Sequence, residues 1–297
     1  MRISYSKLRA WMSCPKQYEF AYVVKIRGAP NDSMKAGRFV HSVLEWKYYH
    51  QDLPIEEYLV SNLPTSEEEL KEQAEYISSI KGIIDENFFK NTIKVEYSLE
   101  FEYEGYLFKT IIDRLDFDGS NYYIYDYKFG KMEYKDEKFS SPMYVIQPIL
   151  YAYAIMDNFN VDKVEFRYYN VFHNSMATKV ITKDTLDMGL VMRLIKDIEN
   201  AEQSTEFTAN IGYQCAGCVY RHLCTDFKRW FKDNYGKHLT STTLVDLLKN
   251  RDNISEEGKK RKFDKFVESY MSSHGISSLQ YDENRFVMVE DGMIKYE

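Results

Sequence analysis

Two neighbouring runs of mainly β-branched, aromatic and other apolar residues stand in the middle of the chain. They extend over Leu107 to Phe117 and Tyr122 to Tyr127, and residues of these types favour β-strands. The four residues between them, DGSN at 118–121, form a strong turn sequence. The pattern therefore predicts a β-hairpin in which Asp118 pairs with Asn121.

This hairpin brings three charged side chains together. Counting outward from the turn places Asp113 directly opposite Asp126, with Lys128 on the same face. Like charges that face each other across a sheet are destabilising, so a cation between the carboxylates is expected. Mg²⁺ and Mn²⁺ prefer oxygen ligands, and a lysine beside such an ion can orient or help deprotonate an attacking water. The alternative is a solvent-facing hairpin with three ordinary charges.

Periodicity along the rest of the chain predicts helices before and between a few strands. A helix over 1–29 is expected to be interrupted at Cys14-Pro15, and Ser141-Pro142 is typical of a helix start. This order of elements predicts an α/β fold with a small mixed sheet flanked by helices. The other expected helices are 37–46, 67 to about 89, 186–202, 243–249 and 256–272, and the other expected strands are 95–104, 163–169, 178–182 and a terminal hairpin within 279–296.

The composition is that of a globular protein. The chain has 297 residues, of which 44% are hydrophobic, enough for one large or two modest domains with a substantial core. No apolar run approaches the ~20 residues that a membrane span needs, and the N-terminus lacks a signal-peptide core, so we expect a cytoplasmic protein that does not associate with membranes. The net charge of -7 argues against a surface coated in basic residues, but it says little about a local nucleic-acid groove.

The four cysteines are unevenly placed along the chain. Cys14 stands near the N-terminus, whereas Cys215, Cys218 and Cys224 lie within CAGCVYRHLC. In a cytosolic chain such clustering indicates metal ligation before disulfide formation. Four thiolates suit a [4Fe-4S] cluster or a tetrahedral zinc ion, and the spacing alone does not separate the two.

The hairpin resembles the D…(D/E)xK core of the PD-(D/E)XK nuclease superfamily, through Asp113 and Asp126-Tyr127-Lys128. Ile112 stands where that family often has its name-giving proline. Further pieces follow the order found in RecB-like nucleases with an iron-sulfur cluster, a group that includes CRISPR-associated exonucleases. These pieces are GRFVH with His41, QPILYAYA with Gln147 and Tyr151, and the cysteines, and the resemblance covers residues 1–228.

The resemblance implies a fold and a role for individual residues. The expected fold is a restriction-endonuclease-like core over 1–228 with an iron-sulfur clasp, followed by a helical and hairpin extension of unknown role over 229–297. The expected ligands of Mg²⁺ or Mn²⁺ are His41, Asp113, Asp126 and the main-chain carbonyl of Tyr127. The expected catalytic residues are Asp113, Asp126 and Lys128, the substrate-binding residues Gln147 and Tyr151, and the ligands of a structural [4Fe-4S] cluster Cys14, Cys215, Cys218 and Cys224.

Two glutamates near this set are weaker candidates. Glu100 fits a position where related nucleases often carry a glutamate near the site, although an exposed strand charge is the simpler explanation. Glu45 lies four residues after His41 and therefore shares a helix face with it. A supporting role beside the metal is the most that the sequence suggests for Glu45.

The resemblance also implies a function. It is that of a metal-dependent deoxyribonuclease, a free-standing exonuclease acting on single-stranded DNA ends in recombination, repair or viral DNA processing. A helicase or recombination protein is the implied class of partner. One alternative is a catalytically inactive DNA-binding or assembly subunit that keeps the fold and cluster as a scaffold. Another is a zinc-stabilised binding module in which the carboxylate hairpin is accidental.

Overall fold

The computed structural model divides the chain into two compact units. The first contains residues 1–8 and 35–197, and the second contains residues 9–34 and 198–297. The residues that the structure describes are 2–28, 30, 32–130, 133–235, 245, 248–249, 251, 257–273, 276–282, 285–290 and 293–296. None of the described helices is both long and apolar enough to cross a membrane.

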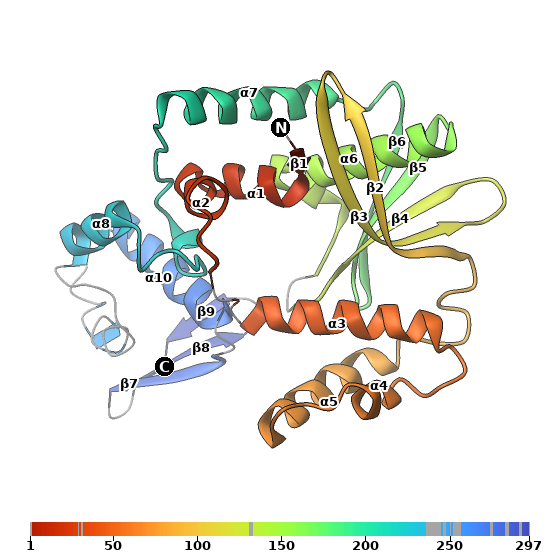
Figure 1. The fold of residues 1–297 in the computed structure, drawn as a ribbon. Helices are drawn as coiled ribbons and strands as arrows, with labels where there is room; N and C mark the ends of the chain where they lie inside the picture. The colour runs from red at the N-terminus through yellow and green to blue at the C-terminus, as the bar shows by residue number, and fades with distance from the viewer. Residues whose placement is uncertain are drawn as a thin grey trace. The chain divides into compact units, whose positions relative to one another are not determined.

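A mixed sheet forms the centre of the first unit (Figure 1). Its strands lie in the order β1-β3-β4-β5-β6, with β2 paired to β3. The β1–β3 and β4–β5 pairs are parallel, and the others are antiparallel. The predicted small mixed sheet is thereby confirmed. The strands are β1 (Arg2–Ser4), β2 (Thr92–Tyr103), β3 (Tyr106–Phe117), β4 (Tyr122–Lys128), β5 (Lys163–Asn170) and β6 (Ser175–Thr182).

The predicted central hairpin is present as β3 and β4. The backbone N–H of Asp118 donates to the carbonyl of Asn121 at 3.3 Å, as the turn sequence predicted. Gly119 has a φ of 97°, a left-handed conformation that glycine adopts without a steric penalty. The pairing continues up to Arg114 opposite Tyr125. The register of the hairpin was therefore readable from the sequence.

Helices pack on both faces of this sheet. The α6 helix follows Ser141-Pro142 as predicted and covers the face that carries Ile124 and Phe166, both fully buried. Figure 1 shows α3 crossing near one end of the strands, with α4 and α5 on its far side. These three helices share a core with Tyr127 and Val171. The helices are α3 (Asp32–Tyr49), α4 (Glu57–Ser61), α5 (Glu67–Lys81), α6 (Pro142–Phe159) and α7 (Met188–Ser204).

The predicted helix over 1–29 is wrong at its start. Arg2–Ser4 is the strand β1, which lies parallel to β3, because pairing with a long central strand outweighs local helix propensity. The interruption at Cys14 is confirmed, since α1 ends at Ser13 and α2 begins at Pro15. The elements are α1 (Tyr5–Ser13), α2 (Pro15–Tyr18) and a π-helical turn over Glu19–Val23.

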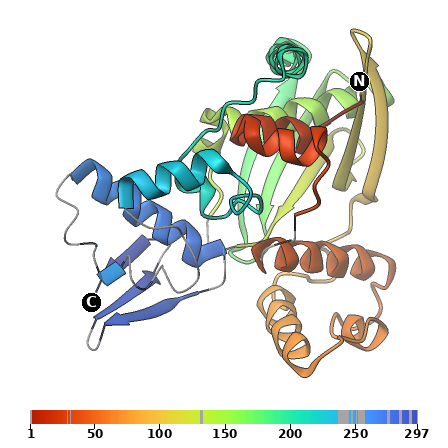
Figure 2. The same ribbon diagram turned by 60° about the vertical axis from the view of Figure 1, so that its left-hand side comes forward.

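The second unit joins the cysteine segment to the end of the chain in one core. Phe227 and Phe231 on α8 pack against Phe266 on α10, and Cys215 and Cys224 belong to the same buried cluster. Figure 2 shows α10 beside the three-stranded sheet β7-β8-β9. The elements are a 3₁₀ turn (Tyr213–Cys215), α8 (Thr225–Tyr235), α10 (Glu257–Ser273), β7 (Ser278–Asp282), β8 (Arg285–Glu290) and β9 (Met293–Tyr296).

Two sequence predictions about the tail have different outcomes. The helix expected over 256–272 and the terminal hairpin are confirmed, and the hairpin gains a third strand. Most of the helix expected over 243–249 lies outside the described residues. The domain boundary after residue 228 stays a prediction, although side chains on both sides of it share one core.

Candidate metal centre

The hairpin places the two predicted aspartates in adjacent positions of paired strands. Asp113 and Asp126 lie one step beyond the Arg114–Tyr125 pair, and successive residues of a strand point to opposite faces. Asp113 is 9% exposed and Asp126 is 3% exposed. Carboxylates are rarely buried unless they are paired or coordinate a metal. Two buried carboxylates side by side on this face of the sheet therefore require a cationic partner.

Helix α3 brings a histidine to these carboxylates. The Nε2 atom of His41 lies 3.1 Å from the Tyr127 carbonyl oxygen, and its Nδ1 atom lies 3.5 Å from Oδ1 of Asp113. The other Asp113 oxygen, Oδ2, accepts a 2.6 Å hydrogen bond from the Tyr127 backbone N–H. When Nε2 carries the proton, it donates to the carbonyl and leaves the Nδ1 lone pair facing the carboxylates. This is the usual way in which a protein fixes the tautomer of a ligating histidine.

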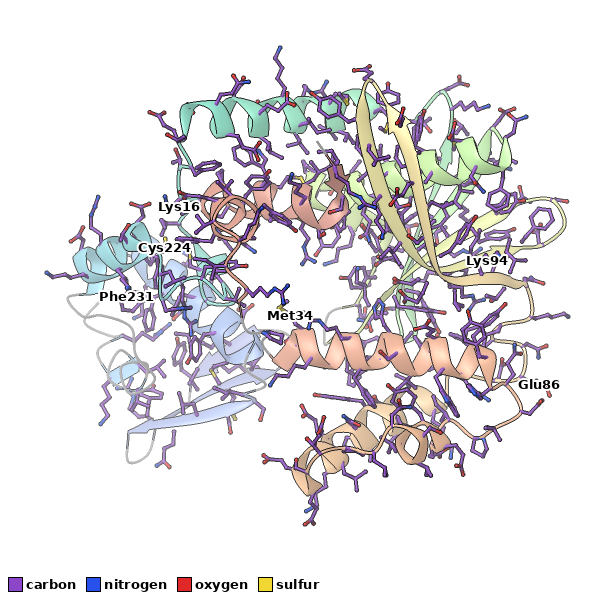
Figure 3. All side chains as sticks on the ribbon, viewed as in Figure 1. Lys16, Met34, Glu86, Lys94, Cys224 and Phe231 are labelled. Atoms are coloured by element: carbon purple, nitrogen blue, oxygen red, sulfur yellow. The ribbon has the colours of Figure 1, made fainter. Side chains whose placement is uncertain are left out.

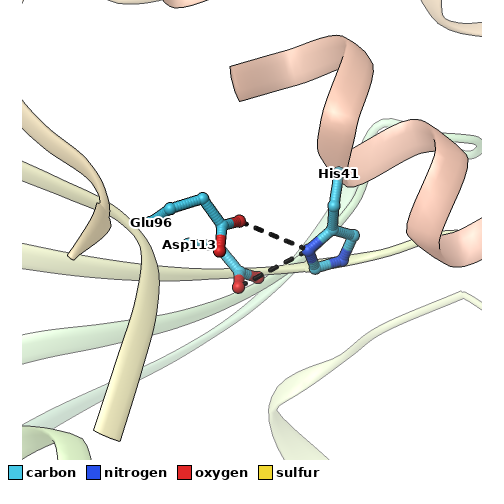
Figure 4. Close-up of side chains that lie close together, drawn as sticks. All are labelled: His41, Glu96 and Asp113. Atoms are coloured by element: carbon cyan, nitrogen blue, oxygen red, sulfur yellow. Dashed lines mark ion pairs between the residues drawn. The ribbon is translucent and has the colours of Figure 1, made fainter. Parts of the chain in front are cut away.

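A third carboxylate, Glu96, completes the group and was missed from the sequence. One ligand atom from each of His41, Glu96 and Asp113 can be chosen so that all three lie within 4.8 Å of one another (Figure 4). Oε1 of Glu96 is 4.0 Å from Nδ1 of His41. Glu96 adopts a φ of 45° within β2, which is uncommon for a residue other than glycine or asparagine. Such outliers cluster at functional sites.

Register counting could have found Glu96. The β2–β3 turn at Glu104-Gly105 pairs Tyr103 with Tyr106, and counting back from that pair sets residue 96 opposite residue 113. The candidate named from the sequence, Glu100, pairs instead with Lys109 and forms an ion pair with Arg2. Its side chain is 44% exposed. Glu100 is therefore an exposed strand charge, the simpler of the two explanations.

A separate set of contacts holds Asp126. Gln147 on α6 donates from Nε2 to Oδ1 of Asp126, and Lys128 Nζ forms an ion pair with Oδ2. The Tyr151 hydroxyl lies 3.1 Å from Gln147 Nε2, which can donate to it. Gln147 and Tyr151 are 4% and 7% exposed. In this structure the predicted substrate-binding pair fixes the carboxylate, and its contact with substrate stays a prediction.

The titration of the site reflects an excess of negative charge. Burial and the neighbouring Asp113 raise the pKa of Glu96 to about 7, and burial raises the pKa of Asp126. Burial lowers the pKa of His41, but the charge of Asp113, its hydrogen bond and the charge of Asp126 together outweigh the burial and raise the pKa to about 9. The crowded carboxylates therefore favour protons or another cation. Carboxylate and carbonyl oxygens suit Mg²⁺ or Mn²⁺, so the oxygen donors of this group fit such an ion.

The four cysteines line one small cavity of about 20 Å³ in the second unit. The backbone N–H of Asn210 donates to Cys14 Sγ at 3.3 Å, and the N–H of Phe227 donates to Cys224 Sγ at 3.4 Å. Burial raises the pKa of Cys215 to about 11. Lys16 and Cys224, both labelled in Figure 3, are far apart in the sequence but line the same cavity.

No three of these four described thiols have sulfur atoms that all lie within 4.8 Å of one another. In a tetrahedral zinc site with Zn–S bonds of about 2.3 Å, the sulfurs are separated by about 3.8 Å. As placed, the thiols form no tetrahedral site, and their spacing does not separate a zinc ion from an iron-sulfur cluster.

A mixed sheet with helices on both faces and a carboxylate–histidine–lysine group at paired strands defines the class as a restriction-endonuclease-like fold with a candidate metal centre. The family model of the PD-(D/E)XK nuclease superfamily matches residues 2–225. The chain belongs to this superfamily.

Comparison with individual proteins gives distant likenesses. The structure is similar to a protein from Eubacterium rectale described as "Putative exonuclease", with 15% identity, a TM-score of 0.49, and coverage of 81% of this chain and 90% of that one. It is also similar to the protein SSO0001, with 15% identity, a TM-score of 0.37, and coverage of 76% and 86%. No curated protein matches the chain significantly.

Proposed function

We propose that this chain is a Mg²⁺- or Mn²⁺-dependent deoxyribonuclease that hydrolyses single-stranded DNA from its ends. The observation that carries the proposal is the juxtaposition of His41, Glu96 and Asp113 beside the Asp126–Lys128 ion pair. A divalent cation held there supplies charge neutralisation for the phosphate and makes bound water more acidic. The preference for single-stranded ends rests on the resemblance to RecB-like exonucleases.

The chain's own groups prepare this chemistry. His41 Nδ1, Glu96 and Asp113 would hold the ion. The other two ligands predicted from the sequence make different contacts here, since the Tyr127 carbonyl faces His41 Nε2 and Asp126 pairs with Lys128, so their coordination of the ion stays a prediction. Gln147 fixes the orientation of Asp126 through Oδ1, so that Oδ2 faces Lys128. The ammonium group of Lys128, which pairs with Asp126 and lies over the Tyr168 ring at 5.3 Å, would orient the attacking water.

The test is cleavage of an end-labelled single-stranded DNA with Mg²⁺, with Mn²⁺ and with chelator. Wild-type protein should degrade the strand only with a divalent ion, and Lys128→Ala should remove most of that activity. Lys71→Ala is the matched control, because Lys71 is 73% exposed and lies on α5. Undegraded DNA under every metal, from folded protein that still binds the strand, would favour the inactive scaffold instead.

A [4Fe-4S] cluster on Cys14, Cys215, Cys218 and Cys224 is the second part of the proposal. It is supported by the shared cavity and by backbone N–H donors to two of the sulfurs. Such N–H groups tune iron-sulfur clusters. Because two of the cysteines belong to the core of the second unit, the cluster would have a structural role.

Anaerobic purification with metal analysis tests this assignment. Visible absorbance near ~400 nm with stoichiometric iron and sulfide is expected, and Cys218→Ser should lower both the absorbance and the melting temperature. Stoichiometric zinc without iron would overturn the assignment. The same preparation, passed over immobilised recombination or helicase proteins, tests the proposed class of partner.

A further inference from the structure

A cavity of about 400 Å³ opens on the other face of the nuclease sheet. The alternation of side chains along β3 and β4 sets Arg114 and Tyr125 on the face opposite Asp113 and Asp126. We call this cavity the back-face pocket. Its lining comes from β3, β4, β5, β6, the turn between β5 and β6, and the segment 87–91. In the sequence, Glu86 precedes that segment and Lys94 follows it, and both are labelled in Figure 3. It contains none of the residues assigned to cleavage.

A buried ion pair forms the floor of the back-face pocket. Arg114 and Asp116 are 5% and 4% exposed. The Nε of Arg114 donates to Oδ1 of Asp116 at 2.7 Å, and a second bond joins Nη2 to Oδ2. Thr92 donates its hydroxyl to the same Oδ1 at 2.7 Å. Arg114 and Asp116 are the charged residues among the described lining of the pocket, and their charges neutralise each other. The pocket therefore offers little attraction to a phosphate group.

Aromatic rings form the walls. The Arg114 guanidinium lies 4.3 Å from the centre of the Tyr125 ring and 4.9 Å from that of Phe88. Tyr169 lines the side next to Tyr125. Flat aromatic and guanidinium surfaces stack on planar ligands with little dependence on sequence.

Three amide side chains stand at the rim. Asn87, Asn91 and Asn174 are exposed and line the pocket. Asn174 accepts a 2.8 Å hydrogen bond from the Tyr169 hydroxyl through its Oδ1 atom, and its NH₂ group is a donor. Amide groups carry a donor and an acceptor side by side, and they pair bidentately with the edges of nucleobases.

We propose that the back-face pocket binds one unpaired nucleobase. The required ligand is planar, uncharged and bordered by donors and acceptors, because the walls are aromatic, the floor is neutral and the rim is made of amides. The volume lies within the range of small-molecule sites. The base can arrive as a free nucleoside or as part of a single strand. Binding here goes beyond the proposed cleavage and does not depend on it.

Calorimetry or ligand-observed NMR with the four 2′-deoxynucleosides tests the pocket directly. The measurements are made on the full chain in chelator, so that cleavage plays no part. At least one nucleoside should bind, and the double variant Asn87→Ala/Asn91→Ala should weaken it by about fivefold or more. Asn62→Ala is the control, because Asn62 is an exposed asparagine at the end of α4, and it should bind like the wild type.

Single strands distinguish the two sources of the base. A strand of about ten nucleotides is compared with an abasic strand of equal length. Stronger binding of the strand with bases, lost in the double variant, indicates a base delivered by DNA. Nucleoside binding without this difference indicates a free nucleoside. The proposal is overturned if no nucleoside binds at millimolar concentration and the two strands bind equally. It is also overturned if the double variant binds every probe like the wild type.

Discussion

The two faces of the central sheet both carry charged side chains but balance their charges differently. On the back face, Arg114 forms its two hydrogen bonds with Asp116, and Arg167 donates to Glu165 at 2.6 Å. On the metal face, carboxylates outnumber their cationic partners, and the pKa of Glu96 rises to about 7. The difference teaches that burial alone does not make a metal site. The candidate metal site differs from the back face in having carboxylates without enough cationic partners around a fixed histidine.

The largest effect is expected from Asp126→Asn. The substitution removes a carboxylate from the metal face and breaks the ion pair with Lys128, so cleavage of single-stranded DNA should fall on the order of 10⁴-fold. The melting temperature of the metal-free protein should not fall, because a buried like charge has been removed. Glu165→Gln, on the back face, is the matched control and should retain cleavage. Equal activity of the two variants would contradict the comparison.

Asp116→Ala should act on stability. It leaves the buried Arg114 guanidinium without its carboxylate, and breaking a buried pair in this way costs about 3–5 kcal/mol. Chemical denaturation of the wild type and the variant measures the difference. An unchanged unfolding midpoint would show that the back-face ion pair is not balanced as described.

The hairpin was predictable because it depends on local information. The DGSN turn and the strand period fix the register, and the register fixes the positions of Asp113 and Asp126. Glu96 was missed because its place depends on a second turn and on a left-handed backbone conformation. The strand over Arg2–Ser4 was missed because its partner, β3, lies about a hundred residues away in the chain. Long-range pairing is absent from local periodicity.

Glu96→Gln should lower the affinity for Mn²⁺ by about 10–100-fold, the range found for residues that support a metal site. The amide keeps the size of the side chain but removes its charge from the set with His41 and Asp113. Isothermal titration with Mn²⁺ gives the dissociation constant. Unchanged affinity would exclude Glu96 from the site.

The metal-free protein should lose stability as the pH rises from 5 to 9. The folded-state pKa of Glu96, about 7, lies above its usual 4.5. Ionising Glu96 as the pH rises above 5 therefore costs more free energy in the folded state than in the unfolded state, and the protein loses stability. The pKa of His41, about 9 against 6.5, gives stability that is complete below pH 6.5 and is lost as the pH rises through 9. Melting temperatures in chelator measure the slope, which should be shallower for Glu96→Gln. A rising melting temperature over this range would contradict the charge balance.

The smallest effect is expected from Glu100→Gln. The exposed ion pair with Arg2 contributes about 0–1 kcal/mol to stability, and the side chain is not in the set of metal-binding atoms found among the described residues. Cleavage and Mn²⁺ affinity should both match the wild type. A large loss of either would return Glu100 to the active site and displace Glu96 as the third carboxylate.

The central claim is that the metal face binds a catalytic divalent cation through its uncompensated carboxylates. The most direct measurement is titration of Mn²⁺ into chelator-free protein, followed by electron paramagnetic resonance, for the wild type, Asp113→Asn and Glu165→Gln. The account predicts that the wild type and Glu165→Gln bind Mn²⁺ and that Asp113→Asn loses this binding. Binding of Mn²⁺ by all three proteins with the same affinity would contradict it.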